Sequence, residues 1–114
     1  MAQAEFVQDG DVIDYTPGAD VDAGTVVVRE DLVGVTKRDI KANSLGSLAV
    51  SGVYDLTKAS GAGVTFAAGA KVYWDATNHR AVAAAGEGGV NKLVGKATVA
   101  AANADATVRT RLSQ

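Results

Sequence analysis

Valine dominates the apolar residues of this chain, and its excess over leucine and isoleucine limits the folds open to it. The 114 residues include 17 valines, six leucines and two isoleucines. Valine prefers strands because its branched β-carbon is stiff and packs well on a pleated surface. Aspartate outnumbers glutamate by ten to three, and aspartate and glycine favour turns over helix interiors. Together these two biases predict an all-β domain with many turns.

Short apolar runs alternate with clusters of turn residues along the chain. Such runs recur about every 8–12 residues, and this spacing predicts a small β-sandwich or a partly closed β-barrel. Gly52 interrupts one run at a position typical of a bulge. The alanine-rich stretch 97–106 offers one short helix as an alternative, since alanine is the best helix former. We expect strands over residues 11–16, 24–30, 31–36, 48–58, 71–75, 79–82, 93–100 and 107–112.

The length suits one domain over residues 1–114, in which residues 1–8 form an extended N-terminal arm. Its core should be thin, because 22 alanines and 13 glycines contribute little side-chain area. A domain of this size with small side chains buries little apolar surface by itself. We therefore expect part of its stability to come from neighbouring molecules.

The residues that usually carry out chemistry are few in this chain. It has no cysteine and one histidine, His79, which excludes thiolate nucleophiles, disulfides and most histidine metal cages. Residues 89–97 come nearest to a phosphate-binding loop, but the glycine spacing is wrong and Ala97 has no hydroxyl for magnesium. The acidic clusters at residues 9–14 and 20–22 lack the closing glutamate of a calcium loop. We expect no enzymatic activity, no cofactor and no bound metal.

Charge and hydropathy restrict the partners of the chain. The formal net charge of −2 argues against direct binding of nucleic acid, which requires clustered positive charge. No stretch approaches the roughly 20 consecutive apolar residues of a membrane helix. The first residues also lack the pattern of a secretory signal. We expect neither a nucleic-acid nor a membrane partner, and a protein made in the cytoplasm.

Five stretches, taken in order, resemble a family of small tailed-bacteriophage proteins, the capsid cement or decoration proteins. No single stretch is a chemical signature, and the resemblance depends on their order and spacing over nearly the whole chain. Relatives are sometimes labelled as recombinases of the RecA/RadA type, but such an ATPase needs the phosphate-binding loop rejected above. The five stretches are FVQDGDVIDYT at 6–16, AGTVVV at 23–28, GVYDLTK at 52–58, VYWDATN at 72–78 and DATVRTRL at 105–112.

The resemblance implies a non-enzymatic virion protein that binds the outer surface of an expanded phage head. Such a protein stabilises the head by bridging neighbouring major capsid proteins. The resemblance also implies a homotrimer at three-fold and quasi-three-fold positions, assembled on the head in the host cytoplasm. The alternative is another structural class, namely a phage tail or baseplate β-module or a host-surface adhesin.

Interface residues are expected on the arm and on two strands. Because free chain ends usually fray, we predict that the arm pairs with a capsid segment as an added strand, anchored by Phe6. Tyr73 and Trp74 point to opposite faces of a strand, so either one of them faces an interface or both are buried. Arg109 and Arg111 share one face, which meets a partner or solvent. The predicted interface residues are Ala2, Gln3, Ala4, Glu5, Phe6, Val7, Tyr73, Trp74, Arg109 and Arg111.

Overall fold

The computed structural model describes residues 3–58 and 64–113, and these ranges form two antiparallel sheets without an α-helix. The all-β prediction is therefore confirmed, and the arrangement is consistent with a β-sandwich. The four-stranded sheet has the order β1-β4-β3-β2, with β1 at Val12–Tyr15, β2 at Val26–Arg29, β3 at Leu32–Val35 and β4 at Gly46–Ala49. The five-stranded sheet has the order β5-β9-β8-β6-β7, with β5 at Val53–Thr57, β6 at Lys71–Asp75, β7 at Arg80–Val82, β8 at Lys92–Ala97 and β9 at Thr107–Leu112.

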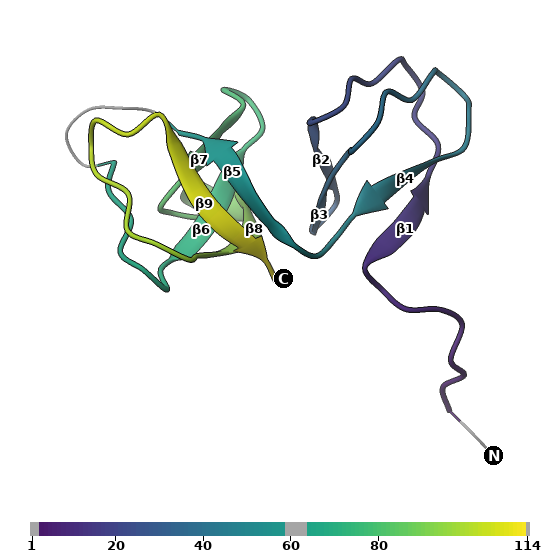
Figure 1. Cartoon of the computed structure of the whole chain (residues 1–114), viewed down its shortest axis with the longest axis horizontal. Coiled ribbons are helices and arrows are strands. Elements are labelled where there is room, and N and C mark those ends of the chain that lie inside the picture. The colour runs from purple at the N-terminus through teal and green to yellow at the C-terminus, as the bar shows by residue number, and fades with distance from the viewer. Residues whose placement is uncertain (1–2, 59–63, 114) are drawn as a thin grey trace.

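The chain completes one sheet before it enters the other (Figure 1). The expected single run over residues 48–58 is wrong, because β4 and β5 belong to different sheets. Between them Gly52 has a φ of 108°, a backbone conformation that favours glycine because it has no β-carbon. Gly52 therefore marks the crossing between sheets. The bulge lies elsewhere, in the pairing of β6 with β8 between Val72 and Tyr73.

The tight turn that joins β6 to β7 is held by one side chain. The Asp75 carboxylate accepts hydrogen bonds from the main-chain N–H groups of Thr77 (3.0 Å) and Asn78 (3.2 Å). It also accepts one from the Asn78 side-chain amide at 2.8 Å. These bonds, with that of the Asn78 side chain the strongest, lower the pKa of Asp75 because they stabilise its charged form. The predicted hairpin turn at this position is confirmed.

The alanine-rich stretch that follows β8 is a loop, so the helical alternative is wrong. Phe66 and Ala101 exchange two main-chain hydrogen bonds, of 3.0 and 2.9 Å, as an isolated β-bridge. The Asp105 carboxylate accepts the Ala102 N–H at 2.7 Å. Aspartate side chains that bind nearby main-chain N–H groups compete in this way with helix formation. Long-range pairing and one carboxylate thus outweigh the helix propensity of alanine.

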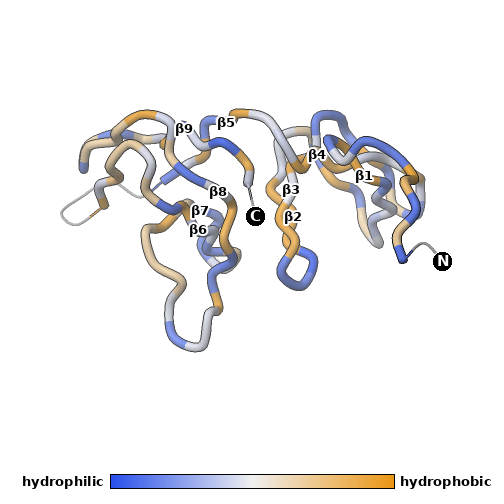
Figure 2. Tube along the Cα trace, turned by 90° about the horizontal axis from the view of Figure 1, so that it is seen from below, coloured by the Kyte–Doolittle hydropathy of each residue, from blue (hydrophilic) through white to orange (hydrophobic). Residues whose placement is uncertain are grey.

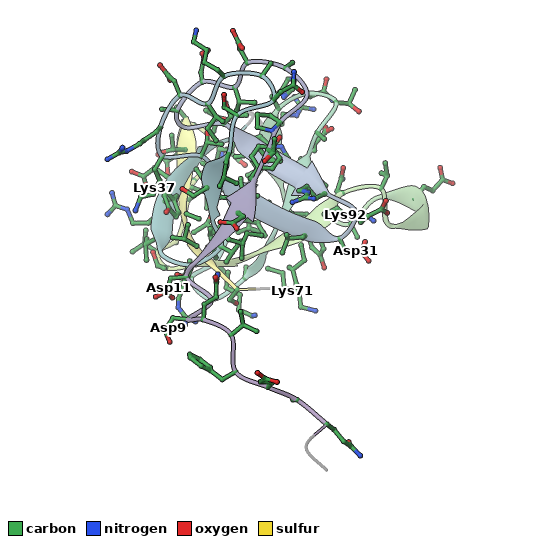
Figure 3. All side chains as sticks on the ribbon, turned by 90° about the vertical axis from the view of Figure 1, so that its right-hand side faces the viewer. Asp9, Asp11, Asp31, Lys37, Lys71 and Lys92 are labelled. Atoms are coloured by element: carbon green, nitrogen blue, oxygen red, sulfur yellow. The ribbon has the colours of Figure 1, made fainter. Side chains whose placement is uncertain are left out.

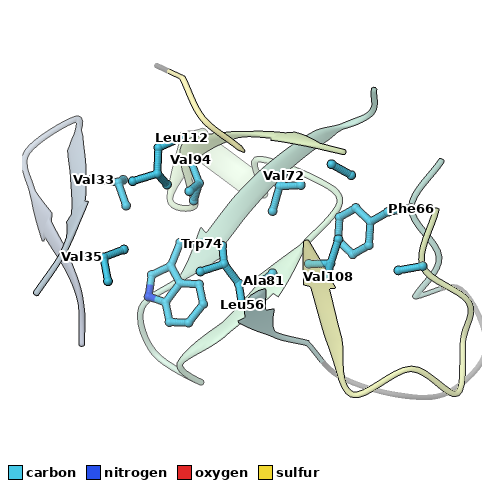
Figure 4. Packing of buried hydrophobic residues seen from close by; sticks show 12 residues of the cluster. Val33, Val35, Leu56, Phe66, Val72, Trp74, Ala81, Val94, Val108 and Leu112 are labelled. Carbon is cyan, nitrogen blue, oxygen red and sulfur yellow. The ribbon is translucent and has the colours of Figure 1, made fainter. Parts of the chain in front are cut away.

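The core lies between the inner face of the five-stranded sheet and the β2–β3 hairpin of the other sheet. Trp74 is 6% exposed and packs in one cluster with Val33 and Val35 of β3 (Figure 4). Figure 2 shows both strands of this hairpin as apolar and the turn between them as hydrophilic. The edge strands of the five-stranded sheet, β5 and β7, form no ladder with each other among the described residues. One isolated bridge, between Lys58 just after β5 and Ala81 of β7, joins these edges. The sheet is therefore not a closed barrel.

Candidate functional site

The N-terminal arm lies outside both sheets and points away from them (Figure 1). Its described residues, from Gln3 to Asp9, are all exposed and belong to no strand. Phe6 and Val7 are 80% and 85% exposed, the highest values among the exposed large apolar side chains of the described residues. The predicted arm residue Ala2 lies outside the described residues. The arm thus presents two large apolar side chains that are not buried against the described part of the chain.

The two aromatic residues of β6 have different environments. Trp74 faces the core, where the β2–β3 hairpin covers it. The expectation that placed Trp74 among the interface residues is therefore corrected, because a buried indole offers a partner no surface. Tyr73 points to the opposite face and is half-buried, so it stays a predicted interface residue. We call this opposite side of the five-stranded sheet the outer face.

Tyr73 belongs to an apolar row on the outer face. In the strand register it lies opposite Val82 on β7 and Leu93 on β8. All three side chains are half-buried. Cross-strand neighbours of this kind contact each other directly. The outer face therefore has an apolar strip that crosses three strands.

A row of positive charges crosses the same face beside this strip. Lys71 on β6 lies opposite Lys96 on β8, which lies opposite Arg111 on β9. All three side chains are exposed. The four ion pairs among the described residues involve none of these cations. Lys71 and Lys96 were not among the predicted site residues, since only the strand register reveals that they form one row with Arg111.

Arg109 shares the outer face with Arg111 but is already paired. Its Nε lies 2.9 Å from Oδ1 of Asp55 on the neighbouring β5, and its Nη2 lies 3.2 Å from Oδ2. This double hydrogen bond lowers the pKa of the Asp55 carboxyl because the guanidinium stabilises its charged form. The arrangement leaves Arg111 as the arginine of this strand that is available to a partner.

Other polar side chains have structural contacts that do not assemble into a reactive site. Within the described ranges, no three His, Cys, Asp or Glu residues gather as metal ligands. A hollow of about 290 Å³ between the sheets is lined in part by Trp74, Thr57 and His79. The Thr57 hydroxyl there donates to the main-chain carbonyl of His79 at 3.1 Å, so its proton is not directed to the imidazole as in a nucleophile–base pair. Asp20 accepts the Ala42 N–H at 2.8 Å, which is a loop contact.

The described part of the chain contains no helix with the length and hydropathy needed to cross a bilayer.

Comparisons with known proteins give a match to a protein family. No curated protein and no solved structure is significantly similar to the chain. The model of one family, described as phage cement protein, matches residues 7–112. This match covers nearly the whole chain and includes every strand. The chain belongs to the phage cement protein family.

Proposed function

We propose that this protein decorates the outer surface of an expanded phage head and stabilises it by bridging neighbouring major capsid proteins. Membership of the phage cement family already implies a structural role in the virion capsid, and this observation carries the proposal. The exposed arm and the mixed apolar and cationic outer face supply surfaces for such contacts.

The arm is the part that we propose to bind the capsid protein. Its residues from Ala2 to Val7 would add as a strand to an extended capsid segment, with Phe6 inserted as an anchor. Extended peptides bind partner strands in this way, because main-chain hydrogen bonds supply affinity and side-chain pockets supply specificity. Full burial of a phenylalanine side chain contributes about 1.5–3 kcal/mol. One arm is thus a modest contact.

Several modest contacts become strong when one assembly grips several capsid subunits. We propose a homotrimer at the three-fold and quasi-three-fold positions of the head, in which three arms bind neighbouring subunits. Linked binding events of this kind gain avidity because later contacts are intramolecular. A ligand that binds only the expanded lattice stabilises that lattice by its binding free energy. Cementing therefore requires no bond-making chemistry.

Binding to undecorated, expanded heads tests this function. The purified protein should bind them to a fixed copy number and raise the temperature at which they release DNA. Deletion of residues 3–7, or Phe6→Ala, should reduce occupancy at a given protein concentration. Leu45→Ala is the matched control, since Leu45 is also an exposed apolar residue but lies far from the arm in sequence.

Two results would contradict the proposal. The first is a failure of the unaltered protein to bind heads while it is found in isolated tails, which would indicate a tail or baseplate module. The second, which bears on the arm alone, is unchanged occupancy after deletion of residues 3–7. In that case the outer face, with Tyr73 and Arg111, would be the capsid-binding surface.

A further inference from the structure

The lysines and arginines around the five-stranded sheet differ in their contacts. Residues 53–114, which contain this sheet, carry seven of them. Four have partners within the described part of the chain. Lys58 donates to main-chain carbonyl oxygens, and three others each form an ion pair with an aspartate, namely Arg80, Lys92 and Arg109. The remaining three are exposed, form no ion pair among the described residues and make up the row on the outer face: Lys71, Lys96 and Arg111.

This row places like charges on neighbouring strands. Lys71 lies opposite Lys96, and Lys96 lies opposite Arg111. Such cross-strand partners lie roughly 5 Å apart, and like charges in this position destabilise a sheet. Among the described residues the row makes one side-chain hydrogen bond, from Lys96 Nζ to the Ser113 hydroxyl at 3.4 Å. A carboxylate supplied by a partner molecule would relieve the repulsion, so the row favours an acidic partner.

The base of the arm lies beside one end of the row in the same molecule. The Asp11 carboxylate accepts the Ser51 hydroxyl at 3.0 Å, at the crossing between the sheets. The carbonyl of the next residue, Gly52, accepts the Leu112 N–H at 2.9 Å, and Leu112 follows Arg111 on β9. The arm therefore leaves the molecule next to the Arg111 end of the row (Figure 1). A partner held by the arm is thereby brought close to the row.

Apolar side chains border the row. Val53 on β5 lies opposite Arg111 and is 53% exposed, so it extends the row on the side of the crossing. The half-buried strip of Tyr73, Leu93 and Val82 lies beside the row on the same face. A partner that covers this face therefore buries apolar surface while its carboxylates meet the cations.

We infer that the row Lys71–Lys96–Arg111 binds an acidic segment of the same capsid protein that the arm binds, so that arm and row form one continuous surface. The inference rests on the proposed function for the identity of this partner. In an extended segment, carboxylates on alternate residues lie about 7 Å apart on one side, so two of them fit over three cations that span roughly 10 Å. Attraction between exposed charges is screened by salt, whereas burial of Phe6 is not. The two contacts therefore respond differently to ionic strength.

Binding to expanded, undecorated heads over a range of salt concentrations separates the two contacts. The row variant, Lys96→Gln/Arg111→Gln, should bind roughly tenfold more weakly at low salt and lose most of the salt dependence. The arm variant, Phe6→Ala, should bind more weakly at every salt concentration, with its salt dependence unchanged. The matched control, Lys37→Gln/Arg38→Gln, removes the same charge from exposed positions that follow β3 and should bind like the unaltered protein.

Carbodiimide crosslinking of decorated heads tests the chemistry of the partner, because this reagent joins a lysine amine to a carboxylate in contact with it. Mass spectrometry should find Lys71 and Lys96 joined to aspartate or glutamate of the capsid protein. Lys37, which is also exposed, is the internal control and should not be joined to it. The inference is overturned if the two row lysines are joined only to this protein itself, or to nothing.

The row variant should melt no lower than the unaltered protein, since removal of like charges relieves repulsion; weaker binding is then not a loss of fold. Unchanged head binding and salt dependence of this variant would overturn the inference while the proposed function stands. Failure of the unaltered protein to bind heads would overturn the proposed function itself. Two further results would give the row another partner and overturn the inference: a changed oligomeric state of the row variant in sedimentation velocity, or row-dependent binding of a short double-stranded DNA fragment.

Discussion

The Nζ of Lys92 on β8 lies 2.8 Å from Oδ1 of Asp31 in the β2–β3 turn, so one ion pair joins the two sheets (Figure 3). Hydrogen bonding to Lys92, with its positive charge as the second cause, lowers the pKa of Asp31. The contact lies beside the packing of β3 against Trp74. The ion pair therefore joins the β2–β3 hairpin to the five-stranded sheet at the solvent-exposed edge of their contact.

We expect a small and pH-dependent contribution from this pair. A carboxyl whose pKa is lowered by folding stabilises the protein above its unfolded pKa of about 3.9, and that stabilisation is lost as pH falls through the folded pKa. Asp31→Asn should therefore lower the urea midpoint slightly at pH 7. The difference should begin to shrink as the pH falls below about 4 and vanish once the pH is below the lowered pKa of Asp31. Because exposed pairs contribute little, a double-mutant cycle with Lys92→Met in low salt is the measurement. A coupling that persists unchanged at pH 2 would contradict the assignment.

Removal of the buried indole should be the most damaging single change to the core. Trp74→Ala deletes the side chain that packs with Val33 and Val35, and such truncations cost about 3–5 kcal/mol in the free energy of unfolding. Trp74→Phe should cost less, since an aromatic ring remains. Val99→Ala, at an exposed position, is the control and should change stability by no more than about 0.5 kcal/mol. Urea denaturation followed by far-UV circular dichroism measures all three.

Gly95 should not tolerate a side chain. A β-carbon at this position in β8 would overlap the main-chain carbonyl of Arg111 on β9. Backbone in a paired strand cannot move aside without loss of the ladder, so Gly95→Ala should lower the melting temperature sharply or prevent folding. At Gly10 a β-carbon meets nothing within 4 Å, which makes Gly10→Ala the matched control. Equal melting temperatures for the two variants would show that β8 and β9 are not so closely paired.

A buried lysine should prove structural. Lys58 is 6% exposed, and its Nζ donates to the carbonyl oxygens of Ala102 (3.0 Å) and Asp105 (2.9 Å). Lys58→Met keeps the stem but removes the charged donor of these hydrogen bonds, and a hydrogen bond to a charged group contributes about 1.5–3 kcal/mol. Lys37→Met, at an exposed position, is the control. A Lys58→Met protein as stable as the original would contradict this role.

Local sequence patterns predicted the strands well where side chains alternate or a turn has a dedicated residue. In β9 the alternation of residues 107–112 matches the observed order of exposed and buried side chains, and Asp75 closes the β6–β7 turn as expected. The division of the chain into two sheets was not predictable in this way. A glycine between two apolar runs is compatible with a bulge or a crossing, and only tertiary pairing decides between them.

The candidate site was predictable only where local sequence pattern determines the orientation of a side chain. Exposure of Phe6, outward orientation of Arg111 and the opposite faces of Tyr73 and Trp74 follow from local pattern. The proximity of Lys71, Lys96 and Arg111 does not, since they are far apart in sequence and meet only through strand register. Local pattern also does not decide whether Tyr73 or Trp74 is buried. Trp74 is the buried one because the β2–β3 hairpin packs over its side of the sheet.

The single crossing at residues 50–52 has a mechanical consequence. No strand ladder among the described residues runs from one sheet to the other. A change in tilt between the two sheets therefore leaves the hydrogen-bonded ladders whole. It requires that Val33 and Val35 shift against the Trp74 ring and that the exposed Lys92–Asp31 ion pair adjusts. An icosahedral shell presents chemically identical sites with slightly different curvature. We expect a protein built from two sheets in this way to fit these sites by changing the angle between the sheets at their apolar contact. Neither sheet has to refold.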